Sequence, residues 1–391
     1  MKYFRLIFVA CVAAWIYPSA LQAQSRAPEV VGKIPKQDGY INLRLSLNGK
    51  TQDALFDACE LFLKLKPDVK GATTGARIKV DVGGSELGFA SKSFNWMIGS
   101  RPITPMWTLE HKLESIVAFA GSKAVASVGF AALGTSVIEL NFDRLEVLLL
   151  PSSQGAMFKN KLPILKLDDM PGLKFLVHDK EISFFIATAD NDTLSLPAKL
   201  FDDLVGSKAI LLGKREDSGS VGNSRMVNER IGWFLSGQLM GKNLRGVDVT
   251  REEGETGEIG IQWLRKFNCI FDLGAMSFSY EARTDPKPPV DWQSMLGAIF
   301  EYSSNSVRAW GVREDSAAGR AGLKKGDAVL QFGSIPAAQL NVESMSELIA
   351  ESADKVISCE VERGSPKEII KMNIKLGKFE SLWDFGGRTT E

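Results

Sequence analysis

The first regular pattern in the chain is an alternation of apolar and polar residues over positions 40–48. One set of side chains is apolar and the other polar: Ile41, Leu43, Leu45 and Leu47 against Asn42, Arg44, Ser46 and Asn48. This period of two predicts a strand with one buried face. Asn48-Gly49 is a strong hairpin signal, so we expect the chain to turn back at this point.

The same layout recurs about 130 residues further on. It predicts strands over residues 173–177 and 182–186, separated by a turn at 178–180. Short strands between Gly and Asn residues predominate up to residue 284, with a short helix expected at 197–205. The chain is therefore predicted to be mainly β. Two polar segments, 214–230 and 251–258, are predicted as solvated loops, with a flap over a cleft as the alternative.

The two segments also match in sequence. The first contains Asp57-Ala58-Cys59 after an apolar strand, and the second contains Ala187-Thr188-Ala189. Asp57 precedes Gly129 by 72 residues, and Ala187 precedes Gly260 by 73. A duplication explains this spacing, and the first copy keeps an acid where the second has alanine.

These triplets and glycines resemble the retropepsin-like and pepsin-like aspartic protease families, over roughly residues 39–284. The following tails add to the match, since Leu133 leads to Phe142-Asp143 and Leu264 leads to Phe271-Asp272. The resemblance implies two aspartic-protease-like β-barrel lobes, at 39–150 and 172–284, with a linker at 151–171. It also implies that Asp57 is the candidate catalytic residue and that Ala187 stands at the partner position.

An aspartic protease needs two carboxylates about 3 Å apart that share one proton. Here Ala58 lacks the family's threonine hydroxyl, Cys59 replaces its glycine, and Ala187 replaces the second acid. We therefore expect a pseudoprotease in which Asp57 serves the hydrogen bonds of its turn. Two alternatives would restore an active aspartic peptidase: a second acid from Asp190 or Asp192, or two chains that pair their Asp57 residues.

A proline-rich linker at 285–291 ends this body. After it, the run from Ser316 to Leu330 resembles the signature of bacterial PDZ domains, which implies an α+β domain at 292–378 and a tail at 379–391. The resemblance assigns the carboxylate-binding loop and first strand to Leu296, Gly297, Ala298 and Ile299, a helix to 345–349, and a closing hairpin to 356–364. It implies binding of peptides or protein C-termini by strand addition.

The N-terminus carries Lys2 and Arg5, an apolar run at 6–16 and a small-residue pattern that ends at Ala23. This arrangement predicts a cleavable signal peptide at 1–23, a leader at 24–38, and a secreted or periplasmic protein. A lipoprotein box at Cys11 is not favoured, because the apolar stretch before it is very short. No later segment reaches the roughly 20 apolar residues of a membrane span, so no integral membrane segment is expected after cleavage.

The length of 391 residues predicts two or three domains. Without residues 1–23, 45 basic residues stand against 47 acidic ones, so the charge does not favour a nucleic-acid partner. His111 and His178 lack metal-ligand spacing, and no cofactor or metal is expected. The cysteines after the signal are predicted to be small buried hydrophobes with at most one disulfide: Cys59, Cys269 and Cys359.

Overall fold

A computed structural model of the chain describes most of the residues after the predicted signal peptide. The described residues are 27–37, 40–60, 63–66, 69, 77–82, 85–90, 95–103, 108–110, 124–154, 157–168, 170–189, 193–213, 231–284, 286, 295–303, 306–312, 314, 316–352 and 354–376. The signal peptide, Cys11, His111, the loop at 214–230 and the tail at 379–391 lie outside them.

We call residues 27–154 the first segment; its elements are nearly all strands. They are β1 (Glu29–Lys33), β2 (Asn42–Leu47), β3 (Lys50–Phe56), β4 (Leu63–Leu65), β5 (Arg77–Val82), β6 (Ser85–Ala90), β7 (Trp96–Ile98), β8 (Arg101–Ile103), β9 (Thr108–Glu110), β10 (Ala126–Val128), α3 (Phe130–Leu133), β11 (Val137–Asn141) and β12 (Glu146–Leu150), followed by a 3₁₀ turn at Ser152–Gln154.

The second segment, residues 157–284, repeats this composition. Its elements are β13 (Asn160–Pro163), β14 (Leu165–Leu167), β15 (Met170–Val177), β16 (Lys180–Ala187), β17 (Leu194–Pro197), α4 (Ala198–Gly206), β18 (Ile210–Gly213), β19 (Ile231–Phe234), β20 (Gln238–Leu239), β21 (Lys242–Asn243), β22 (Asp248–Glu252), β23 (Gly257–Gly260), α5 (Ile261–Leu264), β24 (Phe267–Asp272) and β25 (Ser277–Ala282). Strands β13 and β14 lie in the stretch predicted as a linker.

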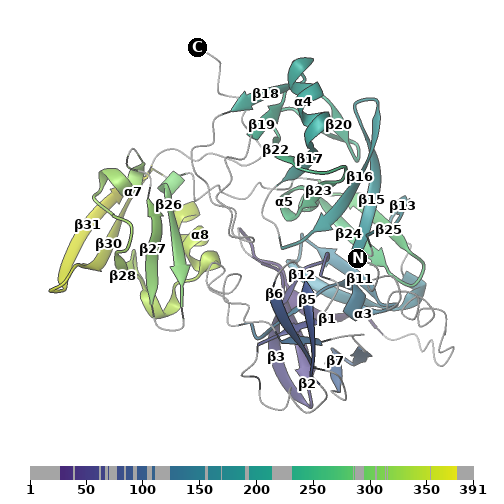
Figure 1. The fold of residues 1–391 in the computed structure, drawn as a ribbon, viewed down its shortest axis with the longest axis horizontal. Coiled ribbons are helices and arrows are strands. Elements are labelled where there is room, and N and C mark those ends of the chain that lie inside the picture. Colours follow the sequence, from purple (N-terminus) through teal and green to yellow (C-terminus); the bar gives the residue numbers. More distant parts are fainter. Residues whose placement is uncertain are drawn as a thin grey trace.

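The C-terminal unit, residues 295–376, combines a six-stranded sheet with helices. It contains β26 (Ala298–Tyr302), β27 (Val307–Val312), α7 (Ala317–Arg320), β28 (Ala328–Phe332), β29 (Ile335–Pro336), a 3₁₀ turn at Ala337–Gln339, α8 (Val342–Glu351), β30 (Val356–Arg363) and β31 (Glu368–Lys375). In Figure 1 this unit, coloured light green to yellow, lies to one side of the two segments.

The mainly β prediction is confirmed, and so are both predicted hairpins. Strands β2 and β3 meet at Asn48 and Gly49, whose φ angles of 50° and 80° are the left-handed values that this tight turn requires. All four apolar residues of the alternating run are buried. Strands β15 and β16 meet at His178-Asp179, and α4 covers the predicted helix.

The sheets are open rather than closed, which corrects the expectation of barrel lobes for the described residues. A 15-stranded sheet contains the first segment's strands and also β24, β25 and β13 of the second. This happens because β24 pairs antiparallel with β11, from Leu140 opposite Cys269 to Val137 opposite Asp272. The other strands of the second segment form an eight-stranded sheet and the short β20–β21 hairpin.

The structure also shifts the alignment of the two tails by two residues at their ends. Asn141 accepts a hydrogen bond from the amide of Arg144 at 2.9 Å, and Asp272 accepts the same bond from Ala275 at 2.9 Å. Each turn then ends in a residue with positive φ, Leu145 or Met276. Asn141 is therefore the structural equivalent of Asp272, in place of the match between Asp143 and Asp272.

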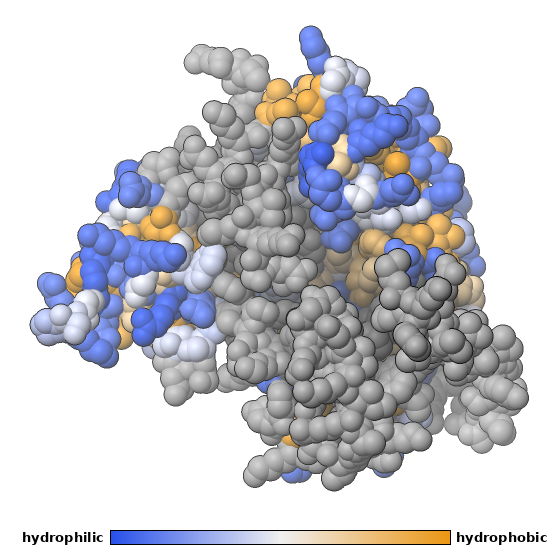
Figure 2. All heavy atoms as spheres, in the orientation of Figure 1, coloured by the Kyte–Doolittle hydropathy of each residue, from blue (hydrophilic) through white to orange (hydrophobic). Residues whose placement is uncertain are grey.

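Burial divides the described residues into two main apolar cores. One large cluster joins the first and second segments, and a second cluster lies wholly within the C-terminal unit. The coloured face of the C-terminal unit in Figure 2 is mostly hydrophilic, with hydrophobic residues between the polar ones. The two segments therefore share one interior, while the C-terminal unit has its own.

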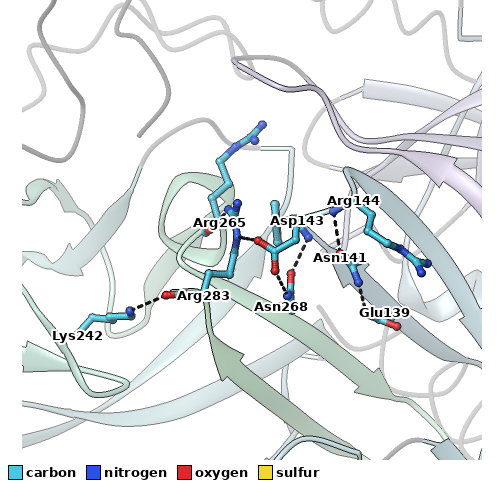
Figure 3. A network of polar contacts seen from close by, with 9 residues as sticks. Glu139, Asn141, Asp143, Arg144, Lys242, Arg265, Asn268 and Arg283 are labelled. Atoms are coloured by element: carbon cyan, nitrogen blue, oxygen red, sulfur yellow. Dashed lines mark hydrogen bonds and ion pairs between the residues drawn. The ribbon is translucent and has the colours of Figure 1, made fainter. Parts of the chain in front are cut away.

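A polar network adds to the join between the two segments (Figure 3). Asp143, in the turn after β11, accepts hydrogen bonds from Arg283 Nε and Asn268 Nδ2, both at 2.6 Å. Asn268 in turn accepts the amide hydrogen of Phe142 at 2.8 Å. Arg265 reaches back to the carbonyl oxygens of Pro35 and Gln37 at 2.9 and 2.6 Å. Side chains of the second segment thus hold main-chain groups of the first.

Candidate functional site

Asp57 lies in a turn directly after β3, and the neighbouring strand β10 fixes its backbone. Strand β3 runs parallel to β10, and the Asp57 amide donates to the Val128 carbonyl oxygen at 3.0 Å. Gly129 follows Val128 at the point of closest approach. A Cβ at Gly129 would collide with the carbonyl oxygens of Asp57 and Glu60, so the glycine lets the two chain segments pack together.

Ala187 occupies the equivalent place in the second segment. It is the last residue of β16, which runs parallel to β23 with Ala187 opposite Gly260. This repeats the relation between Asp57 and Gly129. The side chain of Ala187 is buried, with 7% of the residue exposed. The structure therefore supports the predicted pairing of positions, and the second of them carries a methyl group.

Thr188 links the two turns through its hydroxyl group. Its Oγ1 accepts a hydrogen bond from the Ala58 amide at 2.8 Å and donates one to the Phe56 carbonyl oxygen at 3.1 Å. Thr188 is almost completely buried, with 1% exposed. Both bonds cross from the second segment to the residues on either side of Asp57, so this hydroxyl supports the opposing turn.

Cys59 supplies the return bond from the first segment. Ala58 has no hydroxyl that could reciprocate the contact of Thr188, but the Cys59 thiol donates to the Ile186 carbonyl oxygen at 3.0 Å. Ile186 directly precedes Ala187, just as Phe56 directly precedes Asp57. The cysteine at the glycine position therefore supports the opposite strand end, which the sequence alone did not indicate.

The Asp57 carboxyl group is partly buried and makes a local turn bond. Its Oδ1 accepts the Cys59 amide hydrogen at 3.1 Å. Burial raises the pKa of this carboxyl group, while the Cys59 amide and the Lys64 charge act in the opposite direction. Lys64 is itself paired with Glu60 at 2.6 Å. The predicted role of Asp57 in its own turn is thus visible in the structure.

At the two equivalent positions, 57 and 187, the described residues offer one carboxyl group, that of Asp57. The Asp190 and Asp192 alternative lies outside the described residues. Pairing of Asp57 between two chains would require removal of Thr188 from Phe56 and Ala58, because the second segment already lies against that turn. With alanine at position 187, this turn pair can position a chain or a water molecule but has no partner acid for a shared proton.

The predicted carboxylate-binding loop lies at the start of the C-terminal sheet. Gly297 has a φ of 71°, and a Cβ there would collide with the side chain of Ser316. The Ser316 hydroxyl donates to the Gly297 carbonyl oxygen at 3.2 Å and caps α7 by accepting the Gly319 amide at 3.1 Å. Leu296 and Ala298 are buried and Ile299 is partly exposed. One serine therefore fixes the loop against α7.

Strand β26 forms one end of the C-terminal sheet. Among the described residues it pairs with β27 alone, from Ala298 opposite Val312 to Tyr302 opposite Val307. Its other edge is thus not covered by a described strand. Helix α8 contributes Met345 and Ile349 to the buried cluster that contains Leu296, Ala298 and Phe300, and Figure 1 shows α8 beside this end of the sheet.

An ion pair between Asp327 and Arg363 connects the second half of the 316–330 motif to β30. Asp327 is 1% exposed and receives two hydrogen bonds from Arg363, Nε to Oδ1 and Nη2 to Oδ2, both at 2.6 Å. The Lys324 amide donates to Asp327 Oδ2 at 2.8 Å, and Arg363 also donates to the Gly322 carbonyl oxygen. The sequence predicted Arg363 in the closing hairpin but did not predict this contact. The signal available in the sequence was an Asp in the motif and a basic residue in the hairpin.

The remaining candidates from the sequence are the cysteines and His178. The cysteines of the described residues are free: Cys269 and Cys359 are buried and Cys59 is partly buried. His178 is exposed at its turn. In the described part of the chain, no group of three or more His, Cys, Asp or Glu residues could hold a metal ion. Nor does that part contain a helix long and apolar enough to cross a membrane.

Comparison with known proteins adds no family assignment. No protein-family model matches the chain, and no curated protein matches it significantly.

Proposed function

We propose that this chain is an exported, non-catalytic relative of the aspartic proteases that binds peptides or protein C-termini through a PDZ-like C-terminal unit. The observation that carries the proposal is the edge of β26 that no described strand pairs with, next to a glycine loop held by Ser316. An extended peptide can add to such an edge as a further strand, while backbone N–H groups of the loop hold its terminal carboxylate. Leu296, Gly297, Ala298 and Ile299 are the residues assigned to this role.

We expect no peptide cleavage because of the residues in the two turns, 57–59 and 187–189. Thr188 and Cys59 hold the two turns together, yet the residue equivalent to Asp57 in the second segment is Ala187. The mechanism of aspartic proteases needs two carboxyl groups, one acting as acid and the other as base, and a single carboxyl group cannot supply both. The two-lobed body therefore serves as a scaffold, and the space between its halves serves at most to bind an extended chain.

Peptide binding is tested by titrating pairs of peptides, with a free or an amidated C-terminus, into the chain from residue 24 onwards. We expect the free terminus to bind at least about tenfold more tightly. Gly297→Val should abolish binding, because its Cβ would meet Ser316. Gly364→Val is the matched control, since Gly364 also has positive φ (78°), but a Cβ there would meet only the Pro366 carbonyl oxygen at an ordinary contact distance of 3.6 Å. Binding that Gly297→Val leaves unchanged would refute the assignment.

The alternative function is an atypical aspartic peptidase that uses Asp57, and the raised pKa of this carboxyl group favours it. A peptide library incubated with the chain at acidic pH decides the question. We expect no cleavage. Cleavage that disappears in Asp57→Asn would establish the peptidase and overturn the pseudoprotease proposal, whatever the binding experiment shows.

A further inference from the structure

A second concave site lies in the second segment, at the tip of the β15–β16 hairpin. It is a pocket of about 630 Å³, lined by Leu176, His178, Leu235, Ser236, Gly237, Gln238, Asn243 and Arg245. These residues come from the hairpin tip, the stretch after β19 and the β20–β21 hairpin. The pocket belongs neither to the Asp57 turn nor to the edge of β26, so neither proposed role accounts for it.

The floor of this pocket is rigidly built. The imidazole of His178 stacks on the buried ring of Phe234, with centroids 6.5 Å apart and planes inclined by 24°. Gly237 lies close to the histidine, since a Cβ there would approach Nε2 to 3.3 Å. The Leu244 amide donates to the Gly237 carbonyl oxygen at 3.0 Å, which fixes the loop. The shape is thus set by packing and main-chain bonds.

The polar groups of the pocket favour an anion. Arg245 carries a permanent positive charge, and none of the described residues that line the pocket is acidic. Arg245 has no ion-pair partner among the described residues, and its amide is bound to Asn243 Oδ1 at 2.9 Å. That bond leaves the Asn243 side-chain NH₂ available as a donor. A guanidinium with a neighbouring amide donor matches a carboxylate, which can accept two parallel hydrogen bonds.

The apolar part of the pocket favours an aliphatic chain attached to that anion. Leu176 and Leu235 are large side chains that are 63% and 45% exposed, although both line a concave surface. Apolar side chains gathered around a pocket gain free energy when an apolar ligand group covers them. A ligand with a carboxylate at one end and an aliphatic group beside it satisfies both halves of the lining.

We propose that this pocket binds an aliphatic carboxylate, with the carboxylate at Arg245 and the aliphatic group against Leu176 and Leu235. A free aliphatic acid and the apolar C-terminal residue of a polypeptide share this chemistry. The test uses calorimetric titration of the chain with four probes: octanoate, octanamide, acetyl-Gly-Gly-Leu with a free carboxylate, and the same peptide as an amide. The ionised probes are expected to bind and the two amides are not.

Matched variants assign the signal to this pocket. Arg245→Gln should weaken octanoate binding at least about tenfold, while Arg144→Gln, at another exposed arginine, should leave it unchanged. Leu235→Ser should weaken it as well. Leu212→Ser is the control, because Leu212 is 46% exposed, nearly the same as Leu235, but does not line the pocket. Arg245→Lys keeps the charge and should restore part of the affinity.

The results distinguish between the two sources of the ligand and also show when the proposal is wrong. The β26 edge is itself proposed to bind chain termini. For the peptide, only the binding that is lost in Arg245→Gln is therefore assigned to this pocket. If that part is tighter than octanoate binding, the ligand is a polypeptide terminus; if octanoate is tighter, it is a free acid. Equal binding of octanoate and octanamide, no binding of any probe, or octanoate binding unchanged in Arg245→Gln would overturn the proposal.

Discussion

At the scale of single residues, the centre of the body depends on two small side chains that exchange hydrogen bonds between the segments. Thr188 makes two bonds to the first segment, and Cys59 makes one to the second. Burial of an unpaired polar group costs more than the net gain from a typical bond. Loss of either side chain would leave buried polar groups unpaired, so the hydrogen bonds between the two turns stabilise the body.

Replacement of Thr188 by valine should destabilise the body. Valine keeps the shape but leaves the Ala58 amide and the Phe56 carbonyl oxygen without this buried partner. We expect the free energy of unfolding to fall by about 2–3 kcal/mol, measured by urea denaturation followed by tryptophan fluorescence. Thr51→Val, at an exposed position of β3, should change it by less than about 0.5 kcal/mol. Equal effects of the two variants would contradict the role of Thr188.

Asp57 should make stability depend on pH with a defined sign. Burial raises the pKa of its carboxyl group in the folded state, so the folded chain holds this proton more tightly than the unfolded chain does. The stability from this group is complete below the unfolded pKa of about 3.9 and is lost as the pH rises through the folded-state pKa.

The Asp57→Asn variant isolates this dependence, because the amide stays neutral and can still accept the Cys59 amide hydrogen. The variant should become more stable relative to the parent chain as the pH increases from 4 towards 8. Urea denaturation at a series of pH values measures the difference. A difference that is constant, or that falls with pH, would show that the carboxylate is not penalised by burial.

At the scale of elements, the strands and helices with strong local sequence signals were predicted correctly. The prediction fails where an element depends on contacts with residues far away in the sequence. Asn48-Gly49 specifies its hairpin because both residues accept positive φ. The helix at α4 and the 316–330 motif were similarly predictable. The pairing of β11 with β24 was not, because nothing local in either strand indicates its partner. The strands β13 and β14 were missed for the same reason.

The candidate sites show the same division. The equivalence of Asp57 and Ala187 follows from spacing alone, and the structure places Gly129 and Gly260 opposite them as expected. The Cys59 thiol bond was not predictable, because cysteine is usually a small buried hydrophobe and its acceptor lies 127 residues away. His178 lies at the predicted turn, but its place in a pocket could not be predicted, because it depends on the distant Gly237 and Arg245.

Arg363 connects three parts of the C-terminal unit, so its replacement should lower the stability of this unit. Arg363→Gln leaves the Asp327 carboxylate, 1% exposed, with only part of its hydrogen bonds. We expect a loss of about 2–4 kcal/mol in the unfolding free energy of this unit. Lys371→Gln is the control: its ion pair with Glu360 is largely exposed and is expected to contribute less than about 0.5 kcal/mol. Circular dichroism during urea denaturation measures both.

At the scale of the whole molecule, the first and second segments form one folding unit and the C-terminal unit forms another. The 15-stranded sheet and one apolar core run through both segments. Helix α8 is connected electrostatically to the body at Glu343. Burial and the charge of Glu347 raise the pKa of Glu343, whereas Lys33 and Arg265 of the body lower it. Lys33 and Glu343 are exposed, so the attraction between them weakens with salt.

We therefore expect two unfolding transitions in salt of about 0.5 M, where the Debye length is only a few ångströms. Thr188→Val should shift the transition of the body and leave the other unchanged, because its bonds lie entirely between the two segments. Arg363→Gln should shift only the transition of the C-terminal unit, whose core is separate. Differential scanning calorimetry of the parent chain and both variants measures the two transitions. If either variant moves both transitions together, the C-terminal unit is coupled to the body by more than screened charges.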